Sequence, residues 1–281
     1  MKIEHFFDPD TSTFTYIVID EQSKHCAVID PVLDINMASG QTSHQSVDKL
    51  IDYINSNQLK LEWILETHAH ADHISGAFTL KQKIGGKIAI GERILQVQEF
   101  WQAFYGMTLP QQQKMFDHLF KDGEVFHIGE LNVQVMATPG HTPACICYQV
   151  EDSVFVGDTV FMPALGTARA DFPGGSAEQL FQSIQKIFSL PDATKVYVGH
   201  DYPKDGEVAL CKTTVAEQKS KNIMINQTVT KEEYIAKRQA RDKSLAVPRL
   251  LLPAIQVNIQ AGKFIKDETG QDFIKIPINK L

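Results

Sequence analysis

The chain has 281 residues, of which 43% are hydrophobic and 22% are charged, and its formal net charge is −7. These values are typical of a globular protein with a sizeable core, and without a long basic cluster they argue against nucleic acid as a partner. The sequence shows no signal-peptide pattern and no apolar run long enough to span a bilayer. We therefore expect a cytoplasmic protein with no membrane partner.

The four cysteines do not suggest disulfide bonds. Cys26, Cys145, Cys147 and Cys211 are too few and too scattered for a disulfide framework in a chain of this length. Cys145 and Cys147 are two positions apart in a predicted strand, so both side chains lie on one face. We interpret them as buried, unreactive thiols rather than metal ligands.

The first part of the chain predicts a hairpin, a loop, a helix and a strand. Apolar runs at 14–19 and 25–31 flank a polar turn, which predicts a β-hairpin. Residues 34–45 are polar and predict a surface loop, and apolar residues at helical spacing predict a helix over 46–55. The apolar run 61–65 then predicts a buried strand.

Three imidazoles and a carboxylate follow that strand within six positions: His68, His70, Asp72 and His73. On an extended backbone His68 and His70 point to the same side, while Asp72 and His73 can enter from the turn that follows. A single histidine here would suggest an exposed polar loop. Crowded imidazoles, however, lose proton affinity to one another, and neutral imidazole with carboxylate is a ligand set of first-row transition metals. The motif therefore predicts a metal site.

Beyond the motif the sequence alternates helices and strands. Helical spacing predicts a helix over 74–84, and the aromatic, glutamine-rich residues 95–121 predict a pair of amphipathic helices. We expect these aromatics to pack on the core; the alternative is a lid or the contact of a homodimer. Period-two and apolar patterns predict a strand at 131–135, a hairpin at 144–156 and a strand at 195–198.

Three further metal-ligand residue types stand directly after predicted strands. His141, Asp158 and His200 each follow a strand and have a small neighbour that lets the backbone approach a common centre closely. Four strand ends thus each deliver a metal ligand, which is an improbable coincidence. The other histidines stand alone, and we interpret them as surface or satisfied core residues: His5, His25, His44, His118 and His127.

The motifs resemble those of the metallo-β-lactamase superfamily. They read Thr-His-Ala-His-Ala-Asp-His at 67–73, Pro-Gly-His-Thr at 139–142, Gly-Asp-Thr at 157–159 and Gly-His-Asp at 199–201. The resemblance covers nearly the whole chain. It implies an α+β fold, the αβ/βα sandwich, in which two mixed β-sheets face each other between outer helices and the metal lies at one edge. We expect one domain over 1–281, with the part from about 208 packing on the sandwich and framing the substrate cleft.

Within that superfamily the chain resembles the persulfide dioxygenase branch. The segment Gly-Thr-Ala-Arg-Ala-Asp-Phe at 166–172 is similar to one in persulfide dioxygenases, whereas glyoxalase II-type hydrolases usually lack Arg-x-Asp-Phe. The stretches 200–202, 214–217 and 253–258 favour the same branch. Residues 34–45 and 95–121 resemble extensions of a bacterial subgroup of dioxygenase-related proteins, which leaves the thiol carrier open.

The dioxygenase resemblance implies one Fe(II) per chain, held by His68, His141 and Asp158. The remaining motif residues would surround it as orienting groups or as a second site: His70, Asp72, His73 and His200. The expected reaction oxidises glutathione persulfide, or a related small persulfide, with O2 to sulfite and thiol.

Two residues are expected to contact the substrate. Arg169 would bind a glutathione carboxylate, and Tyr202 would add a hydroxyl contact. The alternatives are an ion pair between Arg169 and Asp171 and a packing role for Tyr202.

Two other functions remain open. A glyoxalase II-type hydrolase of glutathione thioesters would hold two metal ions, with Asp158 shared between them, and Zn(II), one or two per chain, is the alternative to iron. His68, His70 and His141 would then form one site, and the other would be made by Asp72, His73 and His200. A metal-binding module without enzymatic activity is a third use of the same fold.

Overall fold

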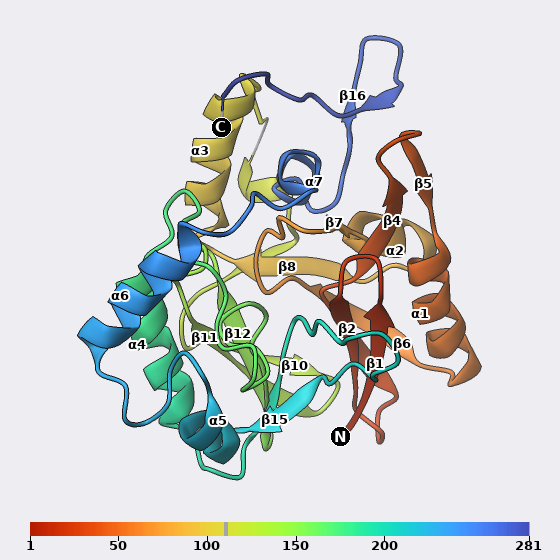
Figure 1. Cartoon of the computed structure of the whole chain (residues 1–281). Helices are drawn as coiled ribbons and strands as arrows, with labels where there is room; N and C mark the ends of the chain where they lie inside the picture. The colour runs from red at the N-terminus through yellow and green to blue at the C-terminus, as the bar shows by residue number, and fades with distance from the viewer. Residues whose placement is uncertain (110–111, 281) are drawn as a thin grey trace.

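Two six-stranded sheets face each other in the computed structural model, which describes residues 1–109 and 112–280 (Figure 1). The first sheet is antiparallel between its first three strands and parallel from β3 onward. In spatial order its strands are β1 (Lys2–Asp8), β2 (Thr13–Ile19), β3 (His25–Ile29), β6 (Lys60–Leu65), β8 (Lys87–Gly91) and β9 (His118–Phe120).

The second sheet is antiparallel except where β13 and β14 run parallel. Its strands, in order, are β10 (Val125–Ile128), β11 (Leu131–Ala137), β12 (Ile146–Val150), β13 (Ser153–Phe155), β14 (Lys195–Tyr197) and β15 (Lys212–Thr214). Smaller sheets are formed by β4 (Val32–Asn36), β5 (Gln41–Ser43) and β7 (Ile74–Ser75), and by β16 (Ile265–Lys266) and β17 (Asp272–Phe273).

Helices cover the outer face of each sheet. One group packs against the first sheet: α1 (Gln45–Ser56), α2 (Ala77–Ile84), α3 (Ile94–Tyr105) and α7 (Leu251–Asn258). On the other side, α4 (Ala177–Phe188) and α5 (Val215–Lys221) pack against the second sheet, and α6 (Lys231–Asp242) packs against α4. In Figure 1, α4, α5 and α6 lie on one side of the paired sheets and α1 and α2 on the other, with α3 and α7 above them. This arrangement confirms the predicted α+β sandwich of two mixed sheets between helices.

The interior between the sheets is aromatic, and two tyrosines cross it. Tyr16 of β2 donates a hydrogen bond to the carbonyl of Val198, just beyond β14. In the opposite direction, Tyr148 of β12 donates to the carbonyl of Glu66, just beyond β6, at 2.8 Å. Both tyrosines are buried. Because β6 and β14 precede His68 and His200, these two bonds fix the strand ends that lead into the predicted metal site.

Most predicted elements are confirmed. The first hairpin is β2 and β3, the helix predicted over 46–55 is α1, and the strand predicted over 61–65 is β6. The strands predicted near 131–135, 144–156 and 195–198 are β11, the β12–β13 hairpin and β14. The strand β1 was not predicted.

Two predictions are wrong in part. Residues 34–45 do not form a loop, because β4 and β5 pair as a surface hairpin with Gly40 at its turn. In the segment 95–121, α3 and a 3-10 turn (Gln112–Lys114) are helical, but residues 118–120 form β9. Backbone pairing with β8 at the open edge of the sheet outweighs local helix propensity there. Residues 110–111 of the predicted helices lie outside the described residues.

The residues beyond 208 form α5, α6 and α7. Of these, α5 and α6 pack against α4, and α7 packs against α3 and β7. The assignment of a single domain stays a prediction. Among residues 1–109 and 112–280, no helix combines the length and apolar content that crossing a lipid bilayer needs.

We predict that Tyr148→Phe lowers the free energy of unfolding by about 1–3 kcal/mol, because the buried Glu66 carbonyl would lose its donor. Urea denaturation measures this change. The control is Tyr53→Phe, because among the described residues that hydroxyl bonds the exposed Lys2 and the half-buried Glu4 side chains, and its effect should stay within about 0.5 kcal/mol. Equal losses in the two variants would contradict the role of the bond across the sheets.

Candidate metal centre and active-site cavity

The predicted ligands converge at one edge of the sandwich. The loop after β6 carries the first four, and the segments after β11, β13 and β14 carry His141, Asp158 and His200. All the imidazoles and Asp158 are buried, whereas Asp72 is partly exposed. Strands that end at the same edge therefore place side chains far apart in sequence around one point.

The ligand atoms form two neighbouring groups. Those of His68, His141 and Asp158 all lie within 4.8 Å of one another, as do those of His70, Asp72 and His73. Asp158 Oδ2 is 3.6 Å from His141 Nε2 and 3.9 Å from His68 Nε2. Two ligands each about 2 Å from one ion lie roughly 3 to 3.5 Å apart, so the first group is close to the spacing of a mononuclear site.

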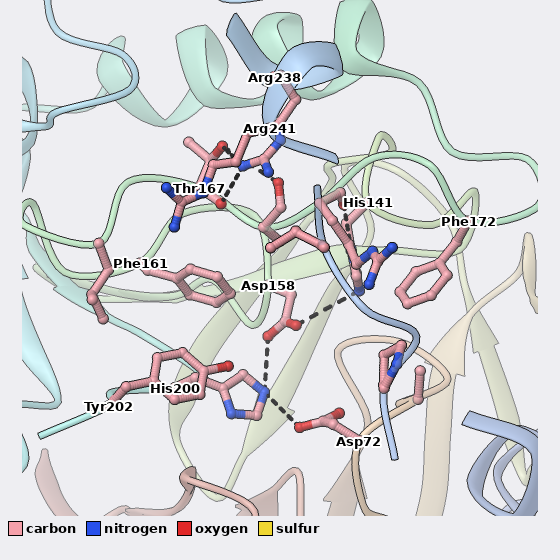
Figure 2. Close-up of a pocket in the computed structure, with 16 residues that line it drawn as sticks. Asp72, His141, Asp158, Phe161, Thr167, Phe172, His200, Tyr202, Arg238 and Arg241 are labelled. Carbon is pink, nitrogen blue, oxygen red and sulfur yellow. Dashed lines mark hydrogen bonds and ion pairs between the residues drawn. The ribbon is translucent and has the colours of Figure 1, made fainter. Parts of the chain in front are cut away.

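His200 lies between two carboxylates. Its Nε2 is 3.1 Å from Asp72 Oδ2 and 3.3 Å from Asp158 Oδ1 (Figure 2). Although burial lowers it, the two carboxylates raise the pKa of His200 to about 9. The two carboxylates thus favour a positive charge at this position, which a protonated His200 supplies and which a metal ion would supply on binding, with release of the proton.

The other nitrogen of several imidazoles is held by a hydrogen bond. Nδ1 of His141 lies 2.7 Å from the Arg169 carbonyl, and Nδ1 of His200 lies 3.0 Å from that of Ser12. Nδ1 of His68 is 3.0 Å from the Thr67 hydroxyl. Such contacts fix ring orientation and tautomer, and they leave Nε2 directed at the centre.

His70 is held the opposite way round. Its Nε2 lies 3.0 Å from Asp30 Oδ1 and 3.1 Å from Glu66 Oε2, so Nδ1 faces the neighbouring ligands. Asp30 also accepts the backbone N–H and the hydroxyl of Thr67, each at 2.7 Å. Sequence reasoning missed both acids. Asp30 directly follows β3, just as the predicted ligands follow their strands, and this position could have identified it. Nothing in the sequence pointed to Glu66 except that it lies next to the motif.

Three imidazole nitrogens in the site have no hydrogen-bond partner among the described residues: His68 Nε2, His70 Nδ1 and His73 Nε2. Buried polar atoms of this kind are rare in folded proteins because leaving them unpaired costs free energy. An ion at the first group would accept the lone pair of His68 Nε2, whereas His70 Nδ1 and His73 Nε2 belong to the second group of potential ligands. Burial, together with neighbouring His70, also holds the pKa of His68 well below its usual range, so its lone pair is free. The residues therefore fit a bound transition metal.

Glycines permit this crowding. Gly157 adopts a positive φ of 47°, and a Cβ there would lie 2.4 Å from the Thr67 hydroxyl oxygen. A Cβ on Gly199 would lie 2.8 Å from Asp158 Oδ1. The small residues noted beside the motifs are therefore required by close approach of other chain segments.

A cavity of about 260 Å³ opens onto the centre. Its walls are formed by the ligands, by aromatic and aliphatic side chains and by three arginines (Figure 2): Ala71, Asp72, His141, Asp158, Phe161, Leu165, Thr167, Ala168, Arg169, Phe172, His200, Tyr202, Arg238, Arg241, Leu245 and Pro248. The volume suits a small molecule. The sequence predicted that the part of the chain from about 208 frames the substrate cleft. It did not single out the residues from α6 onward that line the cavity.

Arg169 and Tyr202 both line the cavity, but their contacts differ from those expected for substrate binding. Arg169 is paired with Asp171 through two hydrogen bonds of 2.6 and 2.8 Å, and it donates a third to the Ala246 carbonyl. The expected fork for a carboxylate is therefore already occupied. Tyr202 stacks on His200 with an interplanar angle of 11° and remains 55% exposed, so its hydroxyl can reach a ligand.

The chain is similar to proteins named for two activities. A sequence model of the metallo-beta-lactamase superfamily matches residues 8–200. Glyoxylase B2 from Dictyostelium discoideum is 52% identical over 100% of this chain and 98% of its own length. Mitochondrial persulfide dioxygenase ETHE1 from Bos taurus is 30% identical over 92% of this chain and 88% of its own length.

A solved structure is also similar. The crystal structure of ETHE1 from Myxococcus xanthus superposes with a TM-score of 0.76 at 30% sequence identity. The match covers 94% of this chain and 100% of that chain. Both the helices and the paired sheets are thus part of the similarity.

We predict that Asp30→Asn weakens metal binding by about 10- to 100-fold, because His70 would lose a carboxylate that orients it. Competition with a chelator measures the affinity. Asp20→Asn is the matched control: Asp20 is also a buried acid after a strand, but it holds the Ser23 hydroxyl and the Glu130 N–H and does not line the cavity. If Asp30→Asn binds metal as tightly as the control, Asp30 has no role in the centre.

Proposed function

Because the chain belongs to the metallo-β-lactamase superfamily, we propose that it is a non-haem Fe(II) persulfide dioxygenase. The substrate would be glutathione persulfide or a related small persulfide, converted with O2 to sulfite and thiol. Similarity to ETHE1 proteins at 30% identity supports this branch. The observation that carries the proposal is the separate grouping of His68, His141 and Asp158.

Two imidazoles and one carboxylate form the ligand set of many non-haem iron oxygenases, because it leaves further coordination positions open. A ferrous ion bound there would supply the activation of dioxygen beside the persulfide sulfur. Asp158 would balance its charge, and the Arg169 carbonyl would keep His141 in the tautomer whose Nε2 can bind. The second group would orient these ligands.

The cavity walls support a persulfide substrate. Phe161 and Phe172 form apolar surfaces beside the ligands, and the ring of Phe172 lies 5.2 Å from that of His141. An apolar wall limits the access of water to a reactive sulfur. The Tyr202 hydroxyl is available for a substrate contact, whereas Arg169 would act by holding the 166–172 segment in place.

The alternative is a glyoxalase II-type hydrolase of glutathione thioesters, with one or two Zn(II) or other ions. The name of the Dictyostelium relative favours it, as does the second group of potential ligands, His70, Asp72 and His73. A non-enzymatic module is less well supported, because no motif position has lost its metal-ligand side chain.

The two enzymes differ in their need for oxygen. We predict that iron-loaded protein consumes O2 in proportion to sulfite released from glutathione persulfide and does not cleave S-lactoylglutathione under anaerobic conditions. An oxygen electrode and a sulfite assay measure the first reaction, and thioester absorbance the second. Anaerobic thioester cleavage without oxygen uptake would establish the hydrolase instead.

Metal counting tests the same choice independently. We predict about one iron per chain in the parent and in His200→Ala, because His200 lies outside the triad that retains the ion. Activity should fall by about 10- to 100-fold through displaced orienting contacts. Elemental analysis of anaerobically prepared protein measures the content. Two ions in the parent that fall to one in the variant would contradict the mononuclear proposal.

A further inference from the structure

The three arginines of the cavity differ in whether their charge is already paired. Arg169 binds Asp171 and the Ala246 carbonyl, as described above. Arg238 is fully buried and pairs with Asp242 at 2.6 Å, and it donates to the Thr167 carbonyl at 2.9 Å. Both guanidinium groups therefore serve the protein itself.

Arg241 has no such partner. Across the part of the chain that the structure describes, its guanidinium makes no ion pair and no hydrogen bond. Tyr234 and Arg238 lie at helical spacing on α6, and both contact Thr167. The Tyr234 hydroxyl is 2.9 Å from the Thr167 hydroxyl, and Arg238 donates to the Thr167 carbonyl. This register keeps Arg241 at the cavity wall, on the side away from Asp72 in Figure 2.

Apart from the arginines and the metal ligands, the polar side chains of the described lining are the hydroxyls of Thr167 and Tyr202, which carry no charge. The carboxylates of the cavity, Asp72 and Asp158, both belong to the metal centre. An ammonium group bound near Arg241 would therefore find no anionic partner among the described lining residues. The intervening walls are apolar: Phe161, Leu165, Phe172, Leu245 and Pro248.

We propose that the cavity takes a sulfur substrate that carries one carboxylate at the end of an apolar chain. The sulfur lies at the metal centre, the chain packs on Phe161 and Phe172, and the carboxylate binds Arg241. An arginine fork suits a carboxylate because it can donate two parallel hydrogen bonds. Glutathione, with two carboxylates and an ammonium, would have only one of its charged groups paired. The placement of the sulfur rests on the proposed function; the Arg241 subsite does not.

Equilibrium binding to metal-loaded protein tests this subsite without turnover. The probes are (methylthio)hexanoate, its neutral amide and S-methylglutathione, and isothermal titration calorimetry gives their affinities. Because Arg241 is exposed, we expect the carboxylate to bind about two- to fivefold more tightly than the amide, as is typical of an ion pair with an exposed side chain, and more tightly than S-methylglutathione.

The variants isolate the charge of Arg241. Arg241→Gln should abolish the preference for carboxylate over amide, and Arg241→Lys should retain part of it. Arg249 is exposed like Arg241 but lines a different pocket, so Arg249→Gln removes the same charge elsewhere and should keep the full preference. An unchanged preference in Arg241→Gln, or tighter binding of S-methylglutathione to the parent, would overturn the proposal.

These outcomes are separable from those of the proposed function. If the preference depends on Arg241 but neither glutathione persulfide nor a carboxylate-terminated alkyl persulfide supports oxygen uptake, the subsite stands and the dioxygenase assignment fails. If glutathione persulfide is oxidised while Arg241→Gln binds all probes as the parent does, the assignment stands and the subsite fails.

Discussion

The burial of five imidazole rings around two carboxylates is the constraint on which this structure depends. The ring centroids of His68 and His70 are only 4.1 Å apart. Rings this close cannot all be positively charged, because like charges repel. In several of these rings, one nitrogen is held by a hydrogen bond to a carbonyl, a hydroxyl or an acid. The other nitrogen of the same ring then faces the centre. A metal ion is the group that satisfies such an arrangement, and the surrounding chain is organised to keep the rings in place.

The fold supplies that organisation at two levels. The paired sheets bring several strand ends to one edge, where Tyr16 and Tyr148 tie them across the interior. On the cavity side, α6 is fixed to the 166–172 segment by the buried Arg238. That segment in turn provides the Arg169 carbonyl that holds His141. The helix α6, far along the chain, thus contributes both to the orientation of His141 and to the wall of the cavity.

Features set by local sequence patterns could be predicted, whereas features that depend on contacts between distant parts of the chain could not. The strands before the motifs carry strong apolar patterns, so the convergence of the ligands could be predicted, whereas the sandwich was implied by the resemblance of the motifs to those of the metallo-β-lactamase superfamily. Asp30 and Glu66 could not be assigned, because their role arises from contact with His70 in three dimensions. Arg241 lies in a helix whose charges resemble an ordinary solvated face. The strand β9 was missed because its formation depends on pairing with β8 rather than on local sequence.

The proposed dioxygenase chemistry depends on where the metal lies and how many ions bind. Anomalous diffraction from a crystal of iron-loaded protein, recorded at the iron absorption edge, locates them directly. We expect one peak within bonding distance of His68 Nε2, His141 Nε2 and a carboxylate oxygen of Asp158. A second peak of comparable height beside Asp72, His73 and His200 would contradict the mononuclear centre and favour a binuclear hydrolase.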